Sequence, residues 1–262
     1  MVKESATTGL RLIHHQNATA VGLAAAQLVA EQLQQKPDAS IVFPTGNTPL
    51  PMYKALRTLS NVNWRQSRLF QLDEYLPPSG GEPGYETFAA YMQRELWAHV
   101  SGQKFYIRDF FDEPEAYERL VSMSQGSPGP DLVILGIGAN GHVAFNEPGS
   151  RPDSPTRVID LTEQTLRSNF GQAHTETATE KNPPVQDNHQ LELPRQAMTL
   201  GLRTILSARK ILLLATGKNK HAILARALNP VSPPALDCPA SWLKTHRNLV
   251  VLTDFPVSFP VD

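Results

Sequence analysis

Residues able to move protons follow a short apolar run in the middle of the chain. The run at 132–135 lies between a proline and a glycine, which is typical of a strand buried on both faces. In open α/β sheets, ligands bind beyond the carboxyl ends of such strands. We therefore expect a proton-transfer site in the polar residues that follow, which are Asn140, His142, Asn146 and Glu147.

The same stretch matches a dinucleotide-binding fingerprint, because Gly136, Gly138 and Gly141 have the required spacing. That site needs a full helix starting at the third glycine, whereas Pro148 follows seven residues later and would end it. We reject the dinucleotide interpretation.

A second candidate site is the turn 44–49 between an apolar strand and a helix. Small residues there let backbone N–H groups approach an anion, and the helix that follows offers its positive end. The turn lacks the lysine of a nucleotide-binding loop, so it favours a simple sugar phosphate. The alternative is an ordinary turn capped by Thr48. The candidate phosphate-binding residues are Thr45, Gly46, Asn47 and Thr48.

Charged residues follow two further strands. The turn 217–220 contains Lys218 and Lys220 and supplies a cation that could close on the phosphate, or both lysines could simply be solvated. Asp73 comes at the end of another strand and could act as a general base, or it could cap the next helix or bind an arginine.

The elements that must position these residues alternate between strand and helix patterns. Such alternation predicts an α/β fold of the doubly wound, Rossmann-like kind, with a mostly parallel sheet and helices on both faces. We predict strands at 10–14, 40–43, 68–72, 104–107, 131–135, 156–161, 210–215 and 248–252, and helices at 18–35, 50–59, 85–99, 113–122, 197–208 and 218–228.

No repeat or domain boundary is evident, so we expect a single domain over residues 1–262. The segment 172–190 has almost no aliphatic residue and cannot bury much apolar surface. We expect a polar lid or a solvated loop around 166–192.

Composition excludes several classes of protein. The formal net charge is −1, which gives no general attraction to nucleic acid or to an anionic membrane. The single cysteine, Cys238, cannot form an intramolecular disulfide, and no run approaches the roughly 18 apolar residues of a membrane span. We expect a soluble cytoplasmic protein without nucleic-acid or membrane partners.

Three segments together resemble the glucosamine-6-phosphate deaminase (isomerase) family. They are Phe-Pro-Thr-Gly-Asn-Thr-Pro at 43–49, Leu-Asp-Glu-Tyr at 72–75 and Gly-Ile-Gly-Ala-Asn-Gly-His-Val-Ala-Phe-Asn-Glu-Pro at 136–148. The related 6-phosphogluconolactonases share the Gly-His but continue differently. The match continues in order through Tyr53–Leu56, Ser154–Arg157, Ala197–Gly201, Gly217 with Lys220, and Pro239–Ser241.

The resemblance implies conversion of glucosamine 6-phosphate and water into fructose 6-phosphate and ammonia, without metal or cofactor. His142 would assist ring opening, oriented by Glu147 and Asn140, and Asp73 would carry a proton between carbon 2 and carbon 1. The residues implied to bind the substrate and its phosphate are Thr45, Gly46, Asn47, Thr48, Gly138, Ala139, Gly141 and Lys220.

Two positions depart from the common family pattern. Asn140 stands where Asp is usual, and an amide fixes the imidazole tautomer without adding a charge. Gly171 stands at the position of a lid arginine that grips the phosphate, for which Arg167 or Arg203 could substitute.

Other functions stay open at this stage. They are deamination of galactosamine 6-phosphate, lactone hydrolysis, and catalytically weak binding of a sugar phosphate. A sugar-phosphate sensor of the kind found in transcription regulators would need a DNA-binding module, for which the first strand, near Leu10, leaves no room. The pattern does not decide between a monomer and a homo-oligomer.

Overall fold

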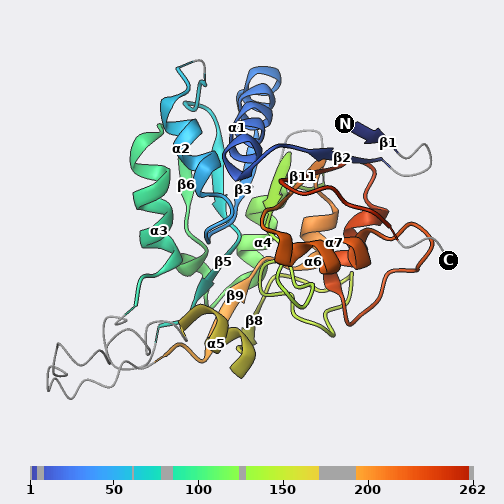
Figure 1. The fold of residues 1–262 in the computed structure, drawn as a ribbon. Coiled ribbons are helices and arrows are strands. Elements are labelled where there is room, and N and C mark those ends of the chain that lie inside the picture. The colour runs from blue at the N-terminus through green and yellow to red at the C-terminus, as the bar shows by residue number, and fades with distance from the viewer. Residues whose placement is uncertain are drawn as a thin grey trace, which may run out of the picture.

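The computed structural model describes residues 2–4, 9–60, 62–77, 85–123, 128–170 and 193–259. The larger of the two sheets in these ranges has eight strands in the order β1-β2-β11-β10-β7-β3-β4-β6 (Figure 1). Every neighbouring pair is parallel except β1 with β2. The strands are β1 (Val2–Glu4), β2 (Leu10–His14), β3 (Ser40–Phe43), β4 (Arg68–Gln71), β6 (Gln103–Phe105), β7 (Leu132–Leu135), β10 (Lys210–Ala215) and β11 (Leu249–Thr253).

Helices cover both faces of this sheet, which confirms the predicted doubly wound fold (Figure 1). Alternate side chains of β7 enter different cores: Val133 and Leu135 pack on one face, and Leu132 and Ile134 on the other. The first face is covered by α4 (Pro114–Ser122), α6 (Leu202–Leu206) and α7 (His221–Leu228); the second by α1 (Ala18–Gln35), α2 (Leu50–Thr58) and α3 (Phe88–Glu95).

The bounds of α1 agree with those predicted from the sequence. Asn17 caps its first turn by accepting a hydrogen bond from the Ala20 N–H at 2.9 Å, and the helix ends before Pro37. A β-carbon on Gly22 would lie 2.4 Å from the Pro51 side chain on α2. The glycine therefore lets the two helices pack closely.

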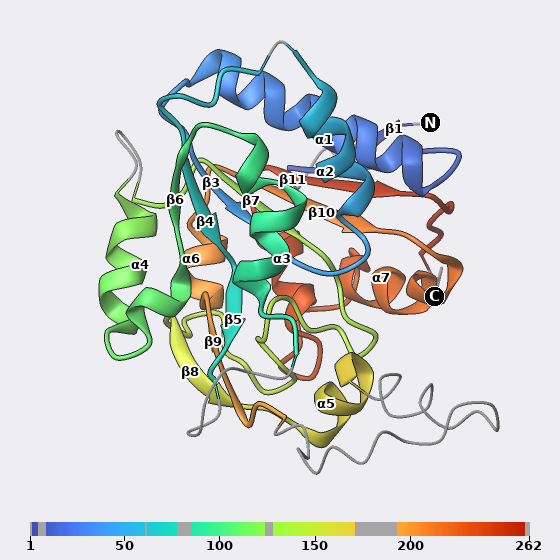
Figure 2. The same ribbon diagram turned by 90° about the vertical axis from the view of Figure 1, so that its left-hand side faces the viewer.

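A second, three-stranded antiparallel sheet was not predicted. It consists of β5 (Asp73–Tyr75), β9 (Gln196–Thr199) and β8 (Arg157–Asp160), with β9 in the centre (Figure 2). The predicted helix at 197–208 is wrong in its first half, because residues there pair with two other strands and only 202–206 is helical. The predicted strand at 156–161 exists as β8 but belongs to this sheet.

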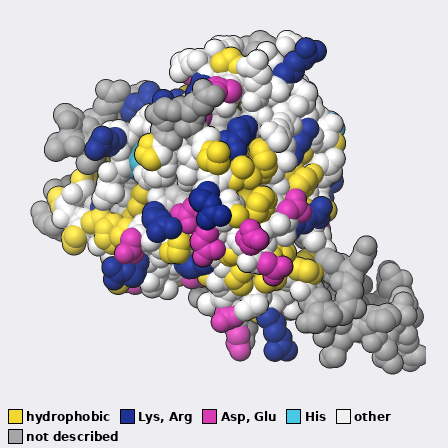
Figure 3. Space-filling view, turned by 180° about the vertical axis from the view of Figure 1, so that it is seen from behind, with side chains coloured by type: hydrophobic (Ala, Val, Ile, Leu, Met, Phe, Trp, Pro, Cys, Tyr) yellow, Lys and Arg dark blue, Asp and Glu magenta, His cyan; other side chains and the backbone are white. Residues whose placement is uncertain are grey.

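The predicted lid begins inside a helix. Residues 166–170 are the second half of α5 (Glu163–Phe170), and the rest of the segment lies outside the described residues. The expectation of a single domain stays a prediction. No helix in the described ranges is long and apolar enough to cross a membrane. On the face drawn in Figure 3, basic and acidic side chains are interspersed.

A buried carboxylate joins the amino ends of β7 and β3. Asp131 is fully buried and accepts hydrogen bonds from the Lys36 ammonium at 2.7 Å and from the Ser40 N–H at 2.9 Å. It therefore helps to fix the alignment of the two central strands.

We predict that Asp131→Ala lowers the free energy of unfolding by about 3 kcal/mol, because it leaves the buried Ser40 N–H without its acceptor and removes the ion pair with Lys36. The matched control is Asp38→Ala, since the Asp38 side chain is 43% exposed and its Oδ1 lies 4.0 Å from the Lys36 Nζ. That change should cost at most about 0.5 kcal/mol. Urea unfolding of both variants measures the difference, and equal losses would contradict the prediction.

Candidate active site

The predicted site residues lie on loops that meet at one edge of the main sheet. The strands β10, β7, β3 and β4 are consecutive neighbours and parallel, so the segments that follow them open at the same edge. The chain order reverses between β3 and β7, and such a switch point is where ligands bind in open α/β sheets. Those segments are 216–220, 136–149, 44–49 and 72–75.

His142, Asn140 and Glu147 form a hydrogen-bonded chain, as the resemblance implied. The His142 Nδ1 lies 2.7 Å from the Asn140 Oδ1, and the Asn140 Nδ2 donates to the Glu147 Oε2 at 2.8 Å. An amide oxygen only accepts, so the imidazole carries its hydrogen on Nδ1 and the neutral ring keeps a lone pair on Nε2. His142 can therefore accept a proton at Nε2.

Burial is the largest influence on the pKa of His142 and lowers it. The Glu147 carboxylate opposes this, whereas the positive charge of Lys220 lowers the pKa further. The imidazole is thereby favoured in its neutral form.

Two glycines shape the turn that carries His142. The imidazole lies against Gly138, where a β-carbon would come within 2.3 to 2.4 Å of ring atoms. Gly141 has a φ of +88° and its carbonyl accepts from the Ala240 N–H at 2.8 Å. No helix starts at Gly141 in the fully described stretch 136–156, which agrees with rejecting a dinucleotide site. Substrate contacts of Gly138, Ala139 and Gly141 stay a prediction.

Asp73 is buried in β5, where it pairs with Thr199 of β9. The Thr199 hydroxyl accepts from the Phe145 N–H at 3.1 Å, so the loop of His142 is joined to the same residue. Burial, with a smaller contribution from the negative charge of Glu74, raises the pKa of Asp73 to about 8. A carboxyl with such a pKa can take up and release protons near neutral pH.

Glu74 has a different role from its neighbour. Its carboxylate accepts hydrogen bonds from the backbone N–H groups of Phe88 at 2.9 Å and Ala89 at 2.6 Å, at the start of α3. The helix-capping alternative considered for the Asp73 segment thus applies to Glu74. Burial raises the pKa of Glu74, and these hydrogen bonds oppose the rise.

The turn 44–49 has the open backbone expected of an anion site. Gly46 is exposed with a φ of +97°, and Asn47 is exposed beside it. Helix α2 starts without a side-chain cap, so the alternative that Thr48 caps it is wrong. The hydroxyls of Thr45 and Thr48 have no hydrogen-bond partner among the described residues.

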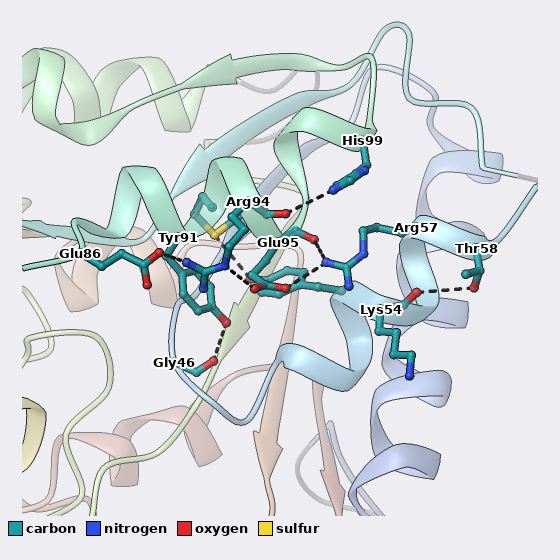
Figure 4. A network of polar contacts seen from close by, with 11 residues as sticks. Gly46, Lys54, Arg57, Thr58, Glu86, Tyr91, Arg94, Glu95 and His99 are labelled. Carbon is teal, nitrogen blue, oxygen red and sulfur yellow. Dashed lines mark hydrogen bonds and ion pairs between the residues drawn. The ribbon is translucent and has the colours of Figure 1, made fainter. Parts of the chain in front are cut away.

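Helix α3 supports this turn through a residue that the sequence did not single out. The Tyr91 hydroxyl donates to the Gly46 carbonyl at 2.5 Å (Figure 4). Glu95 holds α3 to α2 through Arg57 at 2.9 Å and also binds Arg94 at 2.8 Å. The only sequence signal for Tyr91 was its place in a predicted helix.

Lys220 ends a short 3₁₀ turn, Lys218–Lys220, after β10. It is half-buried, which lowers its pKa, and its charge acts on His142. Lys218 is exposed. The alternative of a solvated lysine describes Lys218, whereas the binding of phosphate by Lys220 stays a prediction.

Residues 14–162 and 167–252 match the model of the family described as glucosamine-6-phosphate isomerases/6-phosphogluconolactonase. The chain belongs to this family.

Its relatives include glucosamine-6-phosphate deaminases of Geobacillus sp. (strain WCH70), 34% identical over 94% of this chain and 93% of the relative, and of Bacillus pumilus (strain SAFR-032), 34% identical over 94% and 97%. A solved monomeric glucosamine-6-phosphate deaminase has a TM-score of 0.75 at 32% identity, covering 92% of this chain and 96% of the other. The 6-phosphogluconolactonase from Trypanosoma brucei shares the fold, with a TM-score of 0.66 at 19% identity over 92% and 95% of the two chains.

Two arginines, Arg167 and Arg203, were named from the sequence as substitutes for the lid arginine that the resemblance implies. Gly171 and the side chain of Arg167 lie outside the described residues. The Arg203 side chain is 56% exposed and paired with Glu118 at 3.0 Å, and its replacement of the lid arginine stays a prediction. The structure describes no group of three His, Cys, Asp or Glu side chains that could hold a metal.

The raised pKa of Asp73 makes folding stability depend on pH. The folded protein keeps a proton on Asp73 up to about pH 8, whereas the unfolded chain releases it near the ordinary pKa of 3.8 for an aspartate side chain. Between these values the folded state binds more protons, so its stability falls as pH rises.

We predict that Asp73→Asn abolishes this loss of folding stability at rising pH. Relative to the natural chain, the variant should gain on the order of 3 to 5 kcal/mol of unfolding free energy between pH 4 and pH 9. Urea unfolding across this range measures it, with Asp38→Asn as the surface control. If the unfolding free energies of Asp73→Asn and of the natural chain depend on pH in the same way, the raised pKa of Asp73 is not the cause of the pH dependence.

Proposed function

We propose that the protein is a glucosamine-6-phosphate deaminase of amino-sugar catabolism. It would convert glucosamine 6-phosphate and water into fructose 6-phosphate and ammonia. The observation that carries the proposal is that two groups able to move protons lie at the same edge of the main sheet. They are the neutral, oriented imidazole of His142 and the buried carboxyl of Asp73. The names of the deaminase relatives support the same reaction.

His142 would open the sugar ring. Its unprotonated Nε2 takes the proton of the hydroxyl on carbon 1, and the proton is returned to the ring oxygen as the bond from carbon 1 to that oxygen breaks. This needs a group that both accepts and donates near neutral pH, which an imidazole provides. Asn140 and Glu147 would hold the ring in the required tautomer.

Asp73 would then carry out the isomerisation. Its carboxylate takes the proton from carbon 2 of the open-chain aldehyde, which gives an enolamine, and returns a proton to carbon 1. The resulting imine at carbon 2 is hydrolysed by water to release ammonia. A positively charged substrate amine beside the carboxyl would favour its ionised form.

The phosphate would bind between two strand-to-helix turns. Thr45 and Thr48 offer free hydroxyls, Gly46 and Asn47 offer exposed backbone, and the start of α2 presents its positive end. Lys220 adds a positive charge from the neighbouring turn. We place the enzyme in the cytoplasm, where sugar phosphates are held and where a lone cysteine stays reduced.

We predict that Asp73→Asn lowers turnover of glucosamine 6-phosphate by at least about a thousandfold, because an amide cannot accept the carbon-bound proton. The measurement is release of ammonia together with fructose 6-phosphate, with Asp38→Asn as the control. If the natural chain leaves both glucosamine and galactosamine 6-phosphate unchanged but hydrolyses 6-phosphogluconolactone, the lactonase alternative is correct.

Asn140→Asp should change the pH dependence. The new carboxylate would lie beside Glu147, where the amide now donates at 2.8 Å, and would add negative charge next to the imidazole. The pKa of His142 should rise, and because the reaction needs the neutral ring, the acid limb of kcat/KM should move to higher pH by about one unit. An unchanged pH–rate profile would contradict the hypothesis that residue 140 influences the pKa of His142.

A further inference from the structure

Glu147 is held from the side opposite Asn140 by a residue of α5. The Thr165 hydroxyl lies 2.7 Å from the Glu147 Oε1, while the Asn140 Nδ2 binds Oε2 at 2.8 Å. The Thr165 residue is 5% exposed, so the donor of this contact is buried. Both carboxylate oxygens are therefore occupied, each by a different segment of the chain.

The direction of these hydrogen bonds follows from chemistry. A carboxylate only accepts, so Thr165 must donate to Glu147. The Thr165 oxygen is then free to accept from the Thr162 hydroxyl, which lies 3.0 Å away at the start of α5. One continuous chain thus links Thr162, Thr165 and Glu147 to Asn140 and His142.

We propose that Thr165 is a positioning residue for His142 and acts through Glu147. The proposal rests on the proposed function, in which the imidazole must keep its Nδ1 hydrogen on Asn140. The Glu147 Oε1 lies 3.5 Å from the His142 Nδ1, beyond good hydrogen-bonding distance. The Thr165 hydroxyl holds that oxygen away from the ring, so Asn140 has no competitor for the Nδ1 hydrogen.

Without the hydroxyl, Oε1 loses its donor and the nearest replacement is the imidazole itself. A direct contact of carboxylate and imidazole would favour the charged ring and turn it from its present direction. Among the described residues, the charged groups that act on His142 are Glu147 and Lys220. Lys220 is unaffected by the change, so an increase in the pKa of His142 would report on Glu147.

Helix α5 has a second anchor that does not involve this hydroxyl. The Phe170 ring packs 5.3 Å from both the Tyr75 and Tyr85 rings, in a cluster that also contains Phe145. Removing one hydroxyl should therefore leave the helix in place. Thr165→Val keeps the branched shape and removes the donor, and Thr165→Ser keeps the donor.

The test compares Thr165→Val and Thr165→Ser with the natural chain in glucosamine 6-phosphate turnover across pH. We expect the valine variant to lose about tenfold in kcat with KM changed less than about twofold, since a misoriented catalytic group slows chemistry more than binding. Its acid limb should move to higher pH. The serine variant should recover most of the activity.

A measurement made without substrate tests the role of Thr165 independently of the proposed deaminase activity. The pKa of His142, followed by NMR of its ring protons, should rise in Thr165→Val and return toward the natural value in Thr165→Ser. This holds even if the natural chain releases no ammonia. The proposal is overturned if the valine variant has an unchanged His142 titration, or if serine fails to restore it. Should the valine variant not fold, Thr165→Ala takes its place.

Discussion

The site depends on the parallel pairing of four neighbouring strands. Pairs such as Leu213 with Leu135, and Val42 with Val133, fix where each strand ends. Parallel neighbouring strands all end at the same edge of the sheet. The sheet itself therefore brings together segments that are more than a hundred residues apart in sequence, and no direct contact between their side chains is needed. Burial on both faces makes this register strict, since a slip of one residue would exchange the contents of the two cores.

The small antiparallel sheet turns this open edge into a buried environment. It places two adjacent carboxyls, Asp73 and Glu74, out of water. Glu74 receives backbone N–H groups at the start of α3, whereas Asp73 has no hydrogen-bond donor among the described residues. Glu74 becomes a structural cap, whereas Asp73, whose pKa is raised to about 8, can react. Environment, and not residue type, separates the two roles.

The sequence predicted well those features that depend on local patterns. The apolar runs of the main sheet and the long helix α1 appear with nearly the expected bounds, because periodicity and burial act within each segment. The second sheet was missed because β5 has three residues and β9 gains its stability from two distant partners. Residues 197–199 have no local preference strong enough to reveal this, so they were assigned to a helix.

The same limit applies to the site. Asp73, His142 and Lys220 could be named because each follows a strand, and a rule connects strand ends with ligands. Tyr91 and Thr165 could not, because their roles come from contacts with Gly46 and Glu147 that only the folded chain creates. Residues that support a site leave a weaker sequence signal than those that do its chemistry.

The amide of Asn140 lets the carboxylate of Glu147 orient the imidazole of His142 without a second negative charge beside the ring. It relays orientation from Glu147 to the imidazole of His142, because its nitrogen donates to the carboxylate and its oxygen accepts from Nδ1. It relays no charge, so burial remains the dominant effect and the ring stays neutral. A carboxylate in the same place would add a second negative charge within hydrogen-bonding distance of Glu147 and beside the imidazole, and would favour the charged ring. With asparagine, the chain keeps the tautomer that proton transfer requires while only Glu147 carries a charge.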